Sequence, residues 1–264
     1  MAQEPNGTLQ RELDYHERLY AGFAQSHFAR AAVRALRRHM VSRIAGLLGA
    51  NSKSVVLSLG CGVGDTELLL APYVAHVTGV DLSPTAIAEA NRASARSGLT
   101  NVLFLEGAWQ NLSVAAEPFD VVLSIFFLHH LPDPQLESFP SQLESLLGPG
   151  GLFYALEPSA RRLSGFVGKL VVPRLMKKYQ TPDERPLLPI RAAVPFRKAG
   201  FQVTTRWFDF LSTPLAGLFP AWPAGYRLSR RIDDGLTALP GVRALSSNFE
   251  LIAQRPRMAS PSST

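Results

Sequence analysis

One short segment near residue 60 constrains the fold of this chain more than any other feature. An apolar run, Val55–Leu59, leads into a loop with glycine at every second position, namely Gly60, Gly62 and Gly64. A second apolar run ends in a lone acid, Asp81, about 20 residues after the first glycine. Glycines at a strand end let the backbone approach a ligand, and an acid at the next strand end can accept both ribose hydroxyls. The segment therefore predicts an α/β fold that binds a nucleotide.

The residue after the third glycine separates two classes of nucleotide cofactor. Dehydrogenases that bind NAD use the pattern G-x-G-x-x-G, whose last glycine lets the helix pack closely on the strand. Here Asp65 stands at that position, and its carboxylate would face the pyrophosphate of a dinucleotide. An NAD-dependent oxidoreductase is therefore the disfavoured alternative, whereas a ligand with adenosine and no phosphates is compatible with this loop.

Four further segments follow the glycine loop in order along the chain. They are residues 102–108, 119–124, 128–132 and 148–151. Together with the glycine loop, this series resembles the motifs of the class I S-adenosylmethionine-dependent methyltransferases, small-molecule type. The resemblance implies S-adenosylmethionine as cofactor, methyl transfer as reaction, and a doubly wound, Rossmann-like sheet of seven mostly parallel strands.

Apolar runs of strand length alternate with helical patterns, as a parallel sheet covered on both faces requires. The expected strands are residues 54–59, 76–80, 102–105, 121–125 and 152–156, and the resemblance adds 201–208 and an antiparallel 249–253. A helix is expected over 66–71, and Ser83 followed by Pro84 predicts the start of another.

We expect one catalytic domain with additions. Residues 1–50 predict a helical N-terminal extension, 51–255 the cofactor-binding domain, and 256–264 a disordered tail rich in Ser and Pro. Two apolar stretches, 161–189 and 211–239, are not needed for the sheet. They are candidate lids over a lipophilic small-molecule acceptor, and the alternative is that they merely pack on each other and on the N-terminal helix.

The formal net charge of +6 invites a nucleic-acid partner, but the basic residues are scattered and no nucleic-acid motif appears. We therefore expect no nucleic acid. Arg30, Arg34, Arg37 and Arg38 share one face of the predicted N-terminal helix, which indicates a solvated face. A peripheral contact with an anionic membrane is the alternative. The oligomeric state is left open.

Cys61 is the single cysteine, so no intramolecular disulfide can form and a reducing compartment is natural. Residues 1–15 lack an apolar signal core, and prolines interrupt the uncharged stretch 210–226. These features favour a cytoplasmic protein.

The family resemblance also implies roles for individual residues. Gly60, Cys61 and Gly62 would border the methionine part of the cofactor. Asp81 would accept the ribose hydroxyls, and Leu82 would lie against the adenine.

Ser124 agrees with the family pattern, but two other positions depart from it. Ser58 and Ala108 stand where the family usually has acids, which leaves a non-catalytic S-adenosylmethionine-binding protein as an alternative. Trp109 is expected to compensate by stacking on the adenine.

His129 and His130 follow the fourth expected strand, where the acceptor should approach, and are the candidate general bases. A packing role is the alternative for both. Glu157, at the end of the fifth strand, is a further candidate, and Tyr20 could close over the cofactor. No metal is expected.

Overall fold

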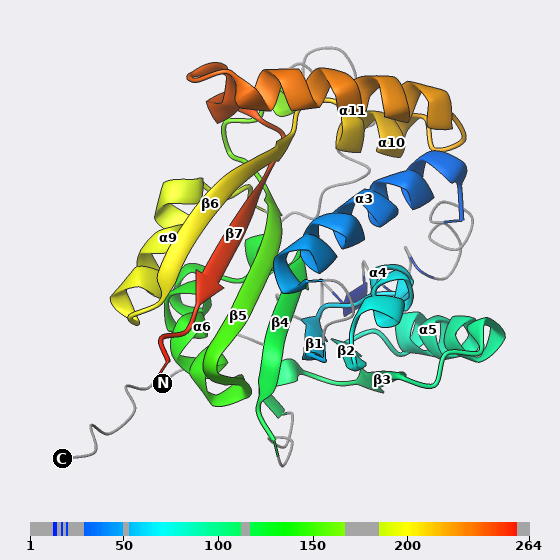
Figure 1. Ribbon diagram of the computed structural model, residues 1–264, viewed down its shortest axis with the longest axis vertical. Helices are drawn as coiled ribbons and strands as arrows, with labels where there is room; N and C mark the ends of the chain where they lie inside the picture. The colour runs from blue at the N-terminus through cyan, green and yellow to red at the C-terminus, as the bar shows by residue number, and fades with distance from the viewer. Residues whose placement is uncertain are drawn as a thin grey trace.

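The computed structural model describes residues 13–14, 17, 20, 29–49, 53–111, 117–166 and 185–257. A seven-stranded sheet crosses the molecule in the order β3-β2-β1-β4-β5-β7-β6 (Figure 1). β7 runs antiparallel to β5 and β6 on either side of it, and the other six strands run parallel to one another. The strands are β1 (Val55–Leu59), β2 (His76–Asp81), β3 (Val102–Glu106), β4 (Phe119–Ile125), β5 (Leu147–Pro158), β6 (Gln202–Asp209) and β7 (Asn248–Gln254). The predicted doubly wound fold is confirmed.

The order of the strands locates the ligand edge. The chain runs outward from β1 through β2 to β3, and then returns to place β4 on the other side of β1. In open α/β sheets, ligands bind at the carboxyl ends of the strands where the winding reverses. The β1 and β4 ends are this switch point, and the glycine loop and the paired histidines follow them directly.

Helices cover both faces of the sheet. They are α3 (Ala31–Leu48), α4 (Asp65–Leu70), α5 (Pro84–Ser97), α6 (Asp133–Leu146), α9 (Pro189–Lys198), α10 (Ser212–Leu218) and α11 (Pro223–Ala238). On one face, α6 and α9 pack against the sheet, and on the other face α3 and α4 do so. Figure 1 shows α10 and α11 together beyond the end of β6.

Aromatic rings build the core between the sheet and helices α6 and α9. Phe139, Phe153 and Phe196 are fully buried, and the rings of Phe153 and Phe196 stack with centroids 5.1 Å apart. Truncating a ring in such a site costs about 3–5 kcal/mol, so this cluster fixes both helices on the sheet.

Residues near the boundaries predicted where the helices and strands begin and end, with one notable exception. Ser83 caps α5 by accepting a 3.0 Å bond from Ala86 N, and Pro84 lies in its first turn, as predicted. The expected start of β5 at residue 152 is wrong, because Leu147 already pairs with Phe119 across an irregularity in the ladder. The glycine-rich run 148–151 therefore lies within the strand.

Several predictions concern residues outside the described part. These are half of the N-terminal extension, the tail from 258, and the greater part of the 161–189 insert. The second insert is described and forms α10 and α11. Among the described residues, no helix has the length and apolarity needed to span a bilayer.

Candidate active site

The glycine loop turns in a conformation that only glycine adopts readily. Gly62 has φ of 54°, and a Cβ there would lie 2.7 Å from Tyr20 Oη. The amides of Gly60 and Cys61 both donate to Val80 O, at 2.8 and 3.1 Å, which fixes the loop on the end of β2. Any side chain at position 62 would therefore meet both backbone strain and a steric contact.

Asp81 joins this loop to the next helix. Its Oδ2 accepts from Gly62 N at 2.8 Å, and its Oδ1 accepts from Ser83 N at 2.9 Å. An ionised carboxylate offers about four lone-pair sites, so two remain for further donors such as ribose hydroxyls. The predicted ribose ligand is thus held in place by backbone groups.

A carboxyl group lies next to Ser58, where the family acid is missing. Ser58 Oγ donates to Glu67 Oε1 at 2.6 Å, and both side chains are buried. Burial, reinforced by the charge of Asp65, raises the pKa of Glu67 to about 7. The acid therefore comes from α4 instead of β1. Sequence reasoning missed Glu67, although an acid beside the apolar run at the end of α4 was an available signal.

Two residues of the N-terminal extension lie at the same edge. Tyr20 lies against Gly62, and burial together with the charge of Asp81 raises the pKa of its phenol, so it stays neutral. The Glu17 carboxylate accepts from the hydroxyls of Ser83 and Thr85 at the start of α5. The structure thus places Tyr20 beside the glycine loop, and its closing over the cofactor stays a prediction.

The remaining predicted cofactor residues lie around this edge. Leu82 is exposed, and Ala108 is half-buried. The ring of Trp109 packs edge-on against Phe139 with centroids 5.2 Å apart, and its stacking on adenine stays a prediction. Cys61 is buried, and burial raises the pKa of its thiol well above the usual value, which disfavours a nucleophilic role.

Among the buried polar atoms that lack a hydrogen-bond partner in the described residues, two belong to residues already assigned to this site. They are Glu67 Oε2, below the glycine loop, and Ser124 Oγ, at the end of β4. Ser124 pairs with Leu59 in the sheet, directly before that loop. Orphaned polar atoms call for a partner. With Asp81 they give a donor and acceptor set that fits S-adenosylmethionine.

The backbone is strained where the chain leaves β4. Phe126 has φ of 56°, which costs a bulky residue on the order of 1–3 kcal/mol. The Glu157 carboxylate holds this turn by accepting from the amides of Phe127, Leu128 and His129, at 3.0, 2.7 and 3.3 Å. Strain that is locked by buried contacts is typical of functional sites.

The same carboxylate orients the first histidine. His129 Nδ1 lies 2.7 Å from Glu157 Oε2, and both side chains are buried. The ring of His130 lies 4.1 Å from that of His129, between centroids. A Cβ on Gly60 would lie 2.7 Å from the Phe127 ring, so the histidine turn borders the glycine loop.

Comparison with known proteins decides the family. A family model described as a methyltransferase domain matches residues 56–151. The ubiquinone biosynthesis O-methyltransferase of Xylella fastidiosa is 30% identical over 201 residues, which are 74% of this chain and 79% of that protein. The chain belongs to the class I S-adenosylmethionine-dependent methyltransferases. It is an enzyme, S-adenosylmethionine is its cofactor, and the two alternatives considered from sequence are set aside.

Other similar proteins agree with this methyltransferase fold. A sterol 24-C-methyltransferase of Gibberella zeae is 32% identical over 144 residues, 52% of this chain and 37% of that protein. The N-methyltransferase NodS of Bradyrhizobium japonicum, solved with S-adenosyl-L-homocysteine, has a TM-score of 0.60. It is 16% identical, and the match covers 94% of this chain and 100% of NodS.

One charged face of the methyltransferase differs from expectation. Arg37 was grouped with the solvated arginines of α3, but it is half-buried and pairs with Asp65 at 2.9 Å. It also donates to Thr66 Oγ1 at 3.2 Å. The reason is that α3 packs on α4, so Arg37 faces the start of that helix, whereas Arg30, Arg34 and Arg38 are exposed.

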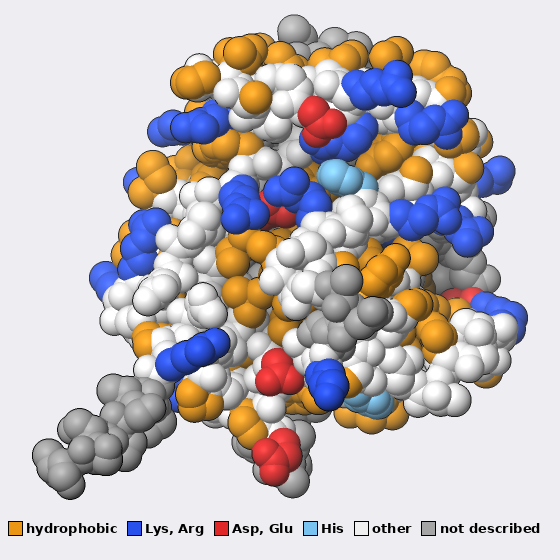
Figure 2. All heavy atoms as spheres, in the orientation of Figure 1, with side chains coloured by type: hydrophobic (Ala, Val, Ile, Leu, Met, Phe, Trp, Pro, Cys, Tyr) orange, Lys and Arg blue, Asp and Glu red, His pale blue; other side chains and the backbone are white. Residues whose placement is uncertain are grey.

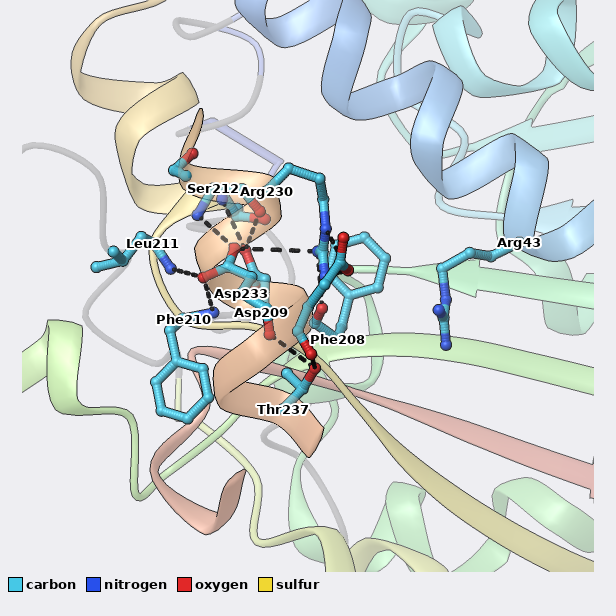
Figure 3. A network of polar contacts seen from close by, with 12 residues as sticks. Arg43, Phe208, Asp209, Phe210, Leu211, Ser212, Arg230, Asp233 and Thr237 are labelled. Carbon is cyan, nitrogen blue, oxygen red and sulfur yellow. Dashed lines mark hydrogen bonds and ion pairs between the residues drawn. The ribbon is translucent and has the colours of Figure 1, made fainter. Parts of the chain in front are cut away.

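Residues 211–239, called the lid from here on, are anchored by two buried acids at the end of β6 (Figure 3). Asp233 of α11 accepts from the amides of Phe210, Leu211 and Ser212, at 3.0, 2.9 and 2.9 Å. Asp209 accepts from Thr213 N at 2.6 Å, and burial raises the pKa of its carboxyl. These contacts, which the sequence did not reveal, fix both helices at the carboxyl end of β6. There α10 and α11 pack on each other and on α3, as the alternative from sequence expected, and their role as a lid over the acceptor stays a prediction.

Proposed function

We propose that this methyltransferase methylates a hydroxyl group of a small lipophilic metabolite, with His129 as general base. The observation that carries the proposal is the buried His129–Glu157 pair, whose side chains approach to 2.7 Å beside the glycine loop. A hydroxyl acceptor must lose a proton, and an oriented imidazole is the side chain suited to take it at neutral pH.

The contacts of each residue indicate its role in binding or in the reaction. Glu157 holds His129 Nδ1, so Nε2 is the nitrogen that would receive the acceptor's proton. When bound, S-adenosylmethionine supplies a methyl group already activated on a sulfonium. Asp81 and the glycine loop would hold the ribose and methionine parts, with Glu67 and Ser124 as further polar partners. His130, next to His129, would border the acceptor.

The acceptor class rests on the relatives. Their names assign them to ubiquinone biosynthesis and to methylation of a sterol carbon, both of which involve apolar compounds. A hydroxylated aromatic or polyprenylated compound fits the compounds that these names print.

Labelled S-adenosylmethionine tests the substrate class. The purified protein is incubated with it and a solvent extract of cells, and the product is identified by mass spectrometry. We expect label in one lipophilic compound that gains a single methyl group. Label confined to water-soluble products would overturn the lipophilic assignment.

Three variants test the base. His129→Gln and Glu157→Gln should lower kcat by about 100-fold or more while leaving cofactor affinity within a factor of about two. His76→Gln is the matched control, because His76 begins β2 at the opposite edge of the sheet. Normal turnover of His129→Gln, or equal loss of cofactor affinity and melting temperature, would show that the pair serves the fold alone.

A further inference from the structure

The last long helix of the lid is amphipathic in the opposite sense to an ordinary surface helix. The face of α11 that packs on the protein buries polar groups, namely Ser229 and Asp233, together with Tyr226. Leu228 and Ile232, one turn apart, are 57% and 43% exposed on the other side. A surface helix normally turns its apolar stripe inward, so this outward stripe requires an explanation.

Neighbouring side chains extend this stripe into a patch, called the outer lid face from here on. Its members are Leu218, Phe219, Trp222, Leu228, Ile232, Leu239, Val242 and Leu245, all exposed. The Phe219 and Trp222 rings contact edge to face with centroids 6.3 Å apart. Figure 2 shows hydrophobic side chains gathered along the border of the molecule formed by α11. Single exposed apolar residues are ordinary, whereas a contiguous set marks an interaction surface.

Arginines are interleaved with these apolar residues. Arg227 and Arg231 flank Leu228 and Ile232 on α11, and Arg243 lies between Val242 and Leu245. All three are exposed. Of the two acids in α11, Asp233 is buried and Asp234 pairs with Arg230 at 2.6 Å. Within the described part of the chain, the outer lid face therefore combines apolar side chains with arginines that no acid is seen to pair.

We propose that the outer lid face docks on the surface of an anionic lipid bilayer, with α11 lying parallel to the membrane plane. Apolar side chains on such a helix enter the boundary between headgroups and acyl chains, while arginines meet lipid phosphates. Trp222 suits the same depth, since indole rings favour membrane interfaces. This site differs from the exposed arginines of α3 considered from sequence.

A second copy of the chain fits this surface less well. In a two-fold dimer the same patch meets itself, which would bring Arg227 and Arg231 close to the same arginines of the other copy. Such like charges repel each other across an interface. A bilayer of anionic lipids offers the complementary charge and an apolar interior together.

The position of the outer lid face links docking to the ligand edge. The lid begins where β6 ends. Because β7 lies between β5 and β6 and runs antiparallel to both, the end of β6 lies at the same edge of the sheet as the carboxyl end of β5. Docking would bring this edge near the lipid, where lipophilic compounds concentrate. Vesicle binding itself needs neither cofactor nor acceptor, so the inference stands or falls independently of the proposed reaction.

Flotation with vesicles tests the docking. The full chain is mixed with vesicles of phosphatidylcholine, with or without phosphatidylglycerol. We expect binding at least about tenfold stronger with the anionic lipid, weakened but not abolished by salt. The double variants L228S/I232S and R227E/R231E should each lose about tenfold in vesicle affinity. Ile190→Ser is the matched control, since Ile190 is 73% exposed on α9 and should change nothing.

The fluorescence of Trp222 reports independently how deeply the outer lid face enters the bilayer. Brominated lipids should quench the wild-type fluorescence, and Trp222→Phe should remove that quenching while Trp109 and Trp207 remain. Unchanged cofactor affinity and melting temperature confirm that the variants fold. Absence of vesicle binding by the wild type, or equal binding by all variants, would overturn the proposal. So would L228S/I232S converting a dimer to a monomer in sedimentation without affecting vesicle binding.

Discussion

The glycine loop is held largely by main-chain hydrogen bonds to β2, whereas the lid is held by the carboxylates of two buried acids. At the first, Gly60 N and Cys61 N bond Val80 O, and Asp81 lies 19 residues from its partner Gly62. At the second, Asp233 reaches back to three amides that begin at Phe210. Glu250 of β7 accepts from Arg43 of α3, 207 residues away. The ligand loop thus depends on backbone geometry, and the lid depends on buried carboxylates that accept from backbone amides.

The largest effect is expected from breaking the glycine loop. Gly62→Val should weaken S-adenosylmethionine binding by about 100-fold or more, because a branched side chain at φ of 54° would meet Tyr20. Gly200→Val is the matched control: Gly200 has φ of 84°, but open space surrounds it at the end of α9. Calorimetric titration of both variants separates the effect of backbone strain from the effect of a side chain placed in the cofactor loop. Equal affinities would mean that the loop does not contact the cofactor.

On the lid side, the equivalent disruptive substitution is Asp233→Ala. It leaves three amides without their acceptor, those of Phe210 and Ser212 being buried, and we expect a loss of about 3 kcal/mol in unfolding free energy. Asp234→Ala, at the exposed neighbouring position, should change stability by about 0.5 kcal/mol or less. Urea unfolding measures both, and cofactor affinity should stay unchanged in each. A loss of cofactor affinity in Asp233→Ala would show that the two sides are not separate.

The same contrast explains what could be predicted from the sequence. The glycine loop, Asp81 and the Ser83 cap were predicted because each depends on neighbours in the chain or on the adjacent strand. Glu67 was missed because its partner is fixed only when α4 folds back on β1. The lid anchor Asp233 was missed for the same reason.

Two further side chains have partners that the sequence does not reveal. Arg37 looks like any surface arginine until α3 is placed on α4, where it pairs with Asp65. Glu157 was considered as a base from its position alone. Its bonds to three amides of the histidine turn needed the packed structure.

Near the glycine loop, Glu67 should make stability fall as pH rises. Its pKa is about 7 in the folded protein and 4.5 as its ordinary value, so between these the folded state holds more protons. Glu67→Gln should remove this dependence. The free energy of unfolding of the variant, relative to that of the wild type, should therefore rise from pH 4.5 to 7 and stay constant at higher pH. Urea unfolding across that range checks it. A constant difference between the two proteins would contradict the raised pKa.

Near the lid, His39 should give an effect of opposite sign. Burial, and then the charges of Arg230 and Arg43, lower the pKa of His39 to about 4 from 6.5. The unfolded state holds more protons between these values, so this residue makes stability rise with pH there. His39→Phe keeps a ring against Phe208 and should flatten that rise. A variant with the wild-type slope between pH 4 and 6.5 would show that His39 is not the group responsible.

The central claim is that the end of β2 holds the cofactor, and one titration tests it directly. S-adenosylmethionine is titrated into the wild type, Asp81→Ala and Asp120→Ala. Asp120 also bonds a backbone amide, Val55 N at 2.8 Å, but it lies near the start of β4 at the opposite edge. The expected result is a dissociation constant about tenfold or more higher for Asp81→Ala, and within about twofold of wild type for Asp120→Ala. A wild-type constant for Asp81→Ala would contradict the account.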